Sequence, residues 1–172
     1  MKLFLDIETN MIEDWIHMTD LKTLHCIVVS VDGAEPRQVT ASQLIELCAI
    51  AEIVIGHNIM AFDLPALQKL IGLKLSCPII DTLVVSRLKY PDLRNDDFGT
   101  LNSGFPKELV GSHSLKAWGH RLKLHKGDAP DFTEFSEEML EYCQQDVRVT
   151  VKLYEHLSIA EIDPKAVEVE HK

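Results

Sequence analysis

The sequence lacks the features of a membrane protein or a disulfide-stapled secreted protein. No apolar run approaches the roughly 20 residues that a membrane-spanning helix needs, and the N-terminus has no signal-peptide pattern. The four cysteines form no C-x-x-C pair, which argues against a zinc site and for reduced thiols. Internal repeats, low-complexity tracts and interdomain linkers are also absent. We therefore expect a globular protein of the cytoplasm.

Basic residues are scarce. The chain has 17 Lys and Arg against 27 Asp and Glu, which gives a formal net charge of −10. A simple DNA-binding module usually carries a basic face that releases counterions from the phosphate backbone. An acidic protein can still act on a polyanion if bound cations invert the local field. The composition favours metal-assisted chemistry over affinity binding, with part of the grip supplied from elsewhere.

The remaining composition is that of one ordinary globular domain. The chain has 172 residues, of which 46% are hydrophobic and 26% charged. This length is enough to bury a core without disulfide or metal staples. We expect residues 1–172 to form a single domain.

Hydrophobic patterning predicts strands in the first part of the chain. Residues 2–6 alternate and end in acids, and residues 24–31 are rich in Val and Ile. Asp32-Gly33 is a favourable hairpin turn before a third strand over 36–40. Residues 53–55 are short and apolar, as a buried strand should be.

Helices are predicted between and after these strands. Ser42 is a plausible N-cap for a helix through Glu52, and Ser136 for a long final helix over 137–157. Three shorter helices are expected over 63–72, 81–89 and 114–122, whereas residues 90–112 look irregular. Strands that alternate with helices after an antiparallel hairpin predict an α/β fold with a mixed central sheet.

Three positions combine acids with a distinctive spacing. Asp6 and Glu8 are two residues apart in an extended segment, so their carboxylates point to the same side. Asp63 opens a helix, and Tyr142 and Asp146 lie four apart on one helix face. Taken singly, each position is ordinary: strand ends often carry acids, Asp63 is explained as an N-cap, and a solvated face tolerates Asp146.

Together these positions resemble a known family. Asp-x-Glu-Thr, then Asn-x-x-x-Phe-Asp, then Tyr-x-x-x-Asp is similar to the three exonuclease motifs of the DEDD superfamily, tyrosine subtype. Residues 81–88 and 111–122 also resemble the proofreading domains of phage family A DNA polymerases. The likeness covers nearly the whole chain in the family's order. It implies a ribonuclease H-like fold, an α/β arrangement with helices flanking a mixed sheet.

The resemblance implies a metal-dependent 3′→5′ exonuclease with Asp6, Glu8, Asp63, Tyr142 and Asp146 as its catalytic residues. The four acids would hold two divalent cations, Mg²⁺ or Mn²⁺, both of which prefer carboxylate and water ligands. Asp6 would bridge both ions, Glu8 and Asp146 would complete the first, and Asp63 would serve the second through water. Tyr142 would orient the attacking water. The histidine subtype instead places a histidine five residues before the last acid, where this chain has Glu141.

Substrate contacts follow from the same resemblance. Thr9 and Asn58 would contact the terminal nucleotide, Phe62 would pack against it and Ile12 would wedge between the last bases. Stacking on an aromatic ring tolerates any base, which suits an editing site. Ile12 and Phe62 are equally well explained as core residues. His57 is expected to be a structural hydrogen-bonding residue at a turn.

The expected partner is a DNA 3′ end, single-stranded or frayed, in a bacterial or phage-infected cell, with no membrane involved. Two alternatives stay open: an exoribonuclease of the same superfamily that trims RNA 3′ ends, and a catalytically silent domain kept as a polymerase scaffold. Asp163-Pro164 looks like the start of another helix. We expect this end to be a short packed tail, or residues 1–172 to be the N-terminal part of a longer DNA polymerase.

Overall fold

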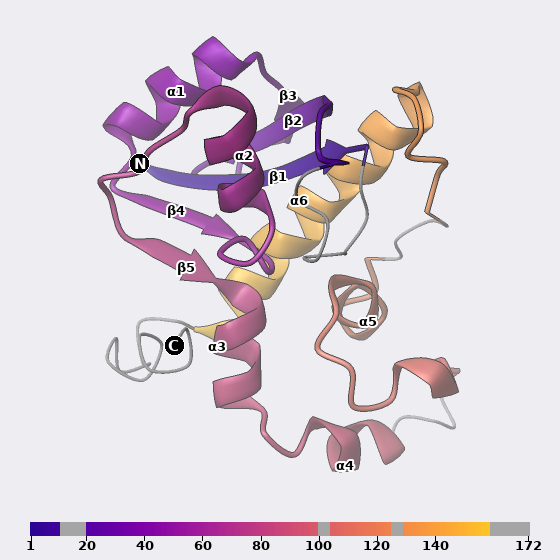
Figure 1. Cartoon of the computed structure of the whole chain (residues 1–172). Helices are drawn as coiled ribbons and strands as arrows, with labels where there is room; N and C mark the ends of the chain where they lie inside the picture. The colour runs from indigo at the N-terminus through magenta and orange to yellow at the C-terminus, as the bar shows by residue number, and fades with distance from the viewer. Residues whose placement is uncertain (11–19, 100–103, 125–128, 159–172) are drawn as a thin grey trace.

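A five-stranded mixed sheet forms the centre of the computed structural model, which describes residues 1–10, 20–99, 104–124 and 129–158 (Figure 1). The strand order is β3-β2-β1-β4-β5. β1 pairs antiparallel with β2 and parallel with β4, and β5 pairs parallel with β4. The strands are β1 (Lys2–Thr9), β2 (Leu24–Val31), β3 (Arg37–Gln38), β4 (Ile53–Gly56) and β5 (Ile79–Asp81). This arrangement confirms the predicted α/β fold with a mixed sheet.

Helices cover both faces of this sheet. α1 and α2 lie together on one side, and α6 crosses the other side (Figure 1). The helices are α1 (Ala41–Ile50), α2 (Asp63–Ile71), α3 (Thr82–Lys89), α4 (Leu93–Phe98), α5 (Leu115–Arg121) and α6 (Glu137–Leu157), with a 3₁₀ turn η3 (Lys107–Leu109). Among the described residues, no helix combines the length and the apolar character needed to cross a membrane.

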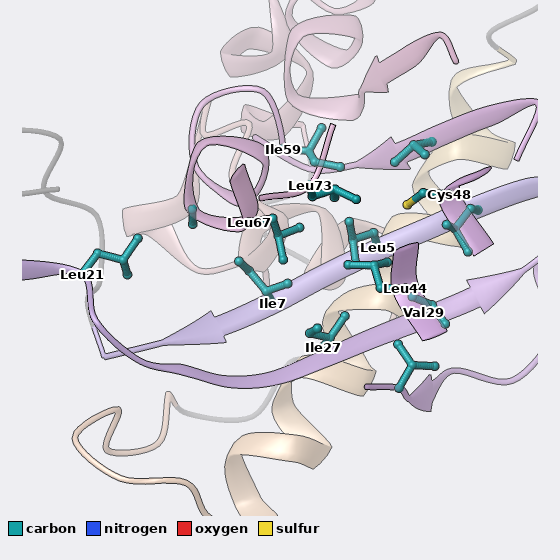
Figure 2. Close-up of a cluster of buried hydrophobic side chains, with 14 residues drawn as sticks. Leu5, Ile7, Leu21, Ile27, Val29, Leu44, Cys48, Ile59, Leu67 and Leu73 are labelled. Atoms are coloured by element: carbon teal, nitrogen blue, oxygen red, sulfur yellow. The ribbon is translucent and has the colours of Figure 1, made fainter. Parts of the chain in front are cut away.

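The central strand β1 separates two hydrophobic clusters because its side chains alternate between faces. Leu5 and Ile7 pack with Leu44 of α1 and Leu67 of α2 in the cluster that Figure 2 shows. Phe4 points the other way and packs with residues of β2 and α6. Asp6 and Glu8 share this second face by the same alternation. The two acids therefore face the α6 side of the sheet.

Most of the predicted elements are present with ends close to the predicted ones, whereas β1 extends to Thr9 and the cap of the first helix is wrong. Asp32 (φ 52°) and Gly33 (φ 84°) form the expected turn after β2, which Ala34 N closes by donating to Val31 O at 2.9 Å, and β3 begins three residues beyond it. The first helix is capped by Thr40, not by Ser42. The Thr40 hydroxyl accepts a hydrogen bond from Gln43 N at 3.2 Å, and the Gln43 side chain accepts one from Thr40 N at 2.9 Å. This reciprocal capping box satisfies two backbone groups at once.

The prediction of irregular structure over 90–112 is wrong in part. Within the described residues of that range lie α4 and η3. α4 presents a buried acid, Asp97, to Arg121 of α5, with Asp97 Oδ2 2.6 Å from Arg121 Nη2. Gly111 N also donates to Asp97 Oδ2 at 2.8 Å. α4 is thus anchored to α5 by an ion pair between residues far apart in the sequence, which no local pattern predicts.

Candidate active site

The end of β1 presents two carboxylates. Asp6 and Glu8 are half-buried on the face of the sheet that α6 covers. A β-bulge follows at Glu8 and Thr9, where the register with β2 shifts. Bulges often re-aim side chains next to functional sites. The alternation expected from the sequence is thus observed, and it directs both acids toward the final helix.

Asp63 reaches the same strand from the other direction. The pairing of β1 with β4 ends at Phe4 and Ile55. Beyond this pair, the backbone N–H of Ile7 has no β4 residue opposite it. The Asp63 carboxylate takes this position, and its Oδ1 accepts the Ile7 N–H at 3.2 Å. The N-cap explanation of Asp63 is wrong, because the cap residue is Phe62. Asp63, at the start of α2, instead bonds to β1 at Ile7, the residue between Asp6 and Glu8.

α6 closes the site from the opposite side of the sheet. Cys143 Sγ donates a hydrogen bond to Asp6 Oδ2 at 3.2 Å. Asp146 follows three residues later, about one turn along, and is 5% exposed. On α6, Val147 packs against the sheet and Val149 packs against α5. Since successive residues of a helix are about 100° apart, Asp146 lies between these two faces. The contact with Asp6 therefore brings the motif-bearing part of α6 onto the β1 acids.

Tyr142 begins the same turn of α6. It is half-buried and lies four residues before Asp146, so the two side chains share one side of the helix. The Phe132 ring meets the Tyr142 ring edge-on, with centroids 6.0 Å apart at 79°. Phe132 O is also 3.1 Å from His25 Nε2 of β2. These contacts hold the Tyr142 ring between α6 and the segment before it.

The electrostatics of the site oppose full ionisation. Burial raises the pKa of Asp63 well above its ordinary value, and the nearby charge of Asp6 raises it further. Burial likewise raises the pKa of the Cys143 thiol, which stays protonated and donates to Asp6. A cation would relieve the repulsion among the acids. One oxygen each of Asp6 and Glu8 and the Cys143 Sγ lie within 4.8 Å of one another; of these three groups the two carboxylates suit a hard divalent ion, whereas the protonated thiol does not.

The predicted substrate contacts divide into three cases. Thr9 is buried beside the β1 acids, and Asn58 is half-buried with a positive φ of 60° in the loop before α2. Phe62 is half-buried and packs against the cluster of α1 and α2, as a core residue would. Ile12 lies outside the described residues. His57 Nδ1 lies 2.9 Å from Thr82 Oγ1, a contact that supports the structural role expected for it.

Two residues at the site escaped prediction. Cys143 has no catalytic motif of its own and looks like core in the helical pattern. Asp81 was placed only at the start of a helix, and β5, which ends at this residue, was not predicted. The only signal for Cys143 is its place one helical turn before Asp146. Asp81 ends β5, and its charge contributes to the raised pKa of Asp63.

Comparison with known proteins finds relatives among phage DNA polymerases. No family model matches the chain. It is 38% identical over 131 residues to the DNA-directed DNA polymerases of Escherichia phage T7 and Enterobacteria phage T3, an alignment that covers 61% of this chain. The same alignment covers 19% of each polymerase, so the chain matches about a fifth of these relatives' length.

Solved structures share the fold at lower identity. The apo form of a nuclease aligns with a TM-score of 0.66 at 20% identity, over 99% of this chain and 77% of that one. Brucella melitensis NrnC aligns at 0.65 and 20%, over 98% and 79%. Exonuclease X in complex with 5′ overhanging duplex DNA aligns at 0.51 and 13%, over the full length of both chains. The chain is thus related to a segment of the phage T7 and T3 DNA polymerases and has a ribonuclease H-like fold, which confirms its resemblance to DEDD 3′→5′ exonucleases of the polymerase proofreading type.

Proposed function

We propose that this chain is a metal-dependent 3′→5′ exonuclease that hydrolyses DNA from its 3′ end and releases nucleoside 5′-monophosphates. One observation supports the proposal: side chains from the start of α2 and from α6 contact β1 at and beside Asp6 and Glu8. Asp63 Oδ1 accepts the Ile7 N–H, and Cys143 Sγ, one turn before Asp146, donates to Asp6. The charge of Asp6 already raises the pKa of Asp63, and the carboxylates of Glu8 and Asp146 beside them would add to the repulsion, which a bound cation would relieve.

Asp6, Glu8, Asp63 and Asp146 would hold two Mg²⁺ or Mn²⁺ ions, which prefer carboxylate and water ligands; Asp6 and Glu8 already lie side by side. Such a pair of ions would activate a water, neutralise phosphate oxygens and stabilise the leaving 3′ oxygen. The chain's own residues supply the positions. Asp6 is held by the Cys143 thiol and Asp63 by the β1 backbone, so both carboxylates are oriented before any ligand arrives.

Binding of the strand end is assigned to the neighbouring side chains. Thr9 and Asn58 would contact the terminal nucleotide, and Phe62 and Ile12 would pack against its base. The phage polymerase relatives and the DNA-bound Exonuclease X neighbour support DNA as the substrate. With a net charge of −10, the chain would hold the DNA backbone mainly through cations, so affinity should be low without them.

A single assay tests reaction type and polarity together. A 5′-labelled single-stranded DNA is incubated with the protein and Mg²⁺, with and without a chelator. We expect a ladder that shortens from the 3′ end and stops when the chelator is added. A matched RNA oligomer, run in parallel, decides between DNA and RNA. An intact DNA at every metal concentration would refute the proposal and favour a silent scaffold.

Tyr142→Phe should slow cleavage by about 10- to 100-fold, the loss typical of a residue that orients a reacting group through hydrogen bonds. The variant keeps the aromatic ring that Phe132 meets and removes only the hydroxyl. Mn²⁺ affinity, measured by calorimetric titration, should stay unchanged because the four acids are intact. An unaltered cleavage rate would remove Tyr142 from the mechanism.

Cation affinity should rise with pH. Because burial and Asp6 raise the pKa of Asp63, this carboxyl retains its proton above the ordinary range near 4, and a bound cation must displace that proton. Titration of Mn²⁺ in buffers of different ionisation enthalpy would count the protons released. Asp63→Asn, which keeps an oxygen acceptor for the Ile7 N–H, should release fewer protons and show a flatter pH dependence.

A further inference from the structure

A buried carboxylate outside the four-acid set lies at the end of β5. Asp81 is 1% exposed and pairs in register with Gly56, the last residue of β4. It is also the N-cap of α3, and its Oδ1 accepts the Leu83 N–H at 2.9 Å. Capping alone would use one oxygen of this carboxylate. Both oxygens also accept hydrogen bonds from another segment of the chain.

That segment is the loop over 57–62, between β4 and α2. Asp81 Oδ1 also accepts the Asn58 N–H at 2.8 Å, and Oδ2 accepts the Met60 N–H at 3.2 Å. One carboxylate thus binds three backbone N–H groups from two elements. Charge-assisted bonds of this kind are stronger than neutral ones. The start of α3 and the loop are therefore joined through a single side chain.

The loop needs such an anchor because its backbone is unfavourable. Asn58 has a φ of 60°, a left-handed conformation that residues other than glycine rarely adopt. The chain also turns back sharply, since a Cβ on Gly56 would lie 2.7 Å from Ile59 side-chain atoms. Within the loop, Asn58 O accepts the N–H groups of Ala61 and Phe62, both at 3.1 Å. The conformation of Asn58 is held from both sides.

Thr82, next to Asp81, makes a second connection. Its hydroxyl donates to Gly56 O at 3.1 Å. Because that proton is used, the contact of 2.9 Å between Thr82 Oγ1 and His57 Nδ1 requires His57 to donate. Asp81 and Thr82 therefore contact four residues of the segment 56–60, which leads to Asp63 at the start of α2.

We propose that Asp81 is a positioning residue that sets the conformation of the Asn58 loop and so governs binding of the strand end. The inference rests on the proposed function, in which Asn58 contacts the terminal nucleotide. Asp63 follows the same loop, but its carboxylate is held separately by Ile7 N. Loss of Asp81 should therefore affect KM for DNA more than kcat.

Two substitutions and one control test this. Asp81→Ala removes all three acceptor contacts, whereas Asp81→Asn keeps one oxygen for Asn58 N and Leu83 N and loses the acceptor for Met60 N. Asp131→Ala is the matched control, because Asp131 Oδ1 accepts Thr133 N at 2.9 Å in an exposed loop. Each variant is measured for amide hydrogen exchange over residues 57–62 and over α6, for KM and kcat on single-stranded DNA, and for Mn²⁺ affinity.

For Asp81→Ala we expect faster exchange over 57–62 with unchanged exchange over α6, and a KM raised by about 10- to 100-fold, since a small misplacement of a contact can cost that much. Asp81→Asn should be intermediate, and Asp131→Ala should match the parent protein. Unchanged exchange over 57–62, or a fall in kcat alone, would overturn the positioning role. If Asp81→Ala fails to fold, parent-like exchange and KM in Asp81→Asn would overturn it equally. An inactive parent protein refutes only the proposed function, because the exchange measurement still decides what Asp81 holds.

Discussion

Asp6→Ala or Asp146→Ala is expected to lower the rate of 3′-end digestion by at least about a thousandfold. Carboxylates that hold catalytic cations supply several kcal/mol of transition-state stabilisation, and about 4 kcal/mol corresponds to a thousandfold in rate. Asp6 lies at the centre of the site, in contact with Cys143 and close enough to Asp63 to raise its pKa. Asp146 lies one turn from that contact, on the buried side of α6.

The fold of both variants should remain intact, because removing an acid relieves repulsion in the metal-free protein. Far-ultraviolet circular dichroism and thermal unfolding would test this alongside the digestion assay. Glu155→Ala is the matched control: it removes a carboxylate from an exposed position of α6 in a pair with Lys152. Near-parental digestion by Asp6→Ala, or unfolding of either variant, would contradict the site assignment.

Asp97→Ala is expected to destabilise the protein by about 3–5 kcal/mol, because it would leave the Arg121 charge without its buried partner. Asp97 accepts from Arg121 Nε at 2.9 Å and from Nη2 at 2.6 Å, a bidentate pair, with side chains 4% and 12% exposed. The guanidinium also lies over the Trp118 ring, 4.9 Å from its centroid. Chemical denaturation would measure the loss.

The control is an ion pair of the same kind at the surface. Glu35→Ala breaks the pair of Glu35 with Arg148, in which Glu35 is 74% exposed, and should cost at most about 1 kcal/mol. Equal losses in Glu35→Ala and Asp97→Ala would show that burial of the Asp97 pair contributes nothing.

The Asp97 pair should also make stability depend on pH. Burial raises the pKa of Asp97, but the hydrogen bonds from Arg121 and Gly111 N and the charge of Arg121 lower it more, so the net shift is downward. A carboxyl with a lowered pKa in the folded state stabilises the protein above its ordinary pKa near 4, and this contribution is lost as pH falls through the folded value. Asp97→Ala should therefore lose less stability on acidification than the parent protein.

The regular elements and the identity of the motif acids were accessible from sequence. β2 and α6 have the predicted bounds, because alternation, serine capping and helical periodicity are local signals. The hairpin turn at Asp32-Gly33 follows from local sterics alone. The sequence alone marks Asp6, Glu8, Asp63 and Asp146 as candidates, because their order and spacing along the chain resemble those of a known family.

Other features depend on partners far away in the chain. β5 is only three residues long and forms because β4 offers an unpaired edge. The cap at Thr40 is an exception, because Gln43 lies only three residues away and Thr-x-x-Gln is a local capping-box pattern. The ion pair that anchors α4 joins Asp97 to Arg121, 24 residues later in the chain. Neither the pairing of β5 with β4 nor the Asp97–Arg121 ion pair produces a local pattern in the sequence.

By itself, the sequence determined which acids this protein carries and on which face of a strand or helix each lies, because local backbone geometry fixes the direction of a side chain. Only the tertiary structure decided that Asp63 bonds to β1 rather than capping its own helix, that Cys143 contacts Asp6, and that Asp81 holds the Asn58 loop. These contacts arise where β1 and β4 separate and α6 crosses the sheet, and such meetings are set by long-range packing.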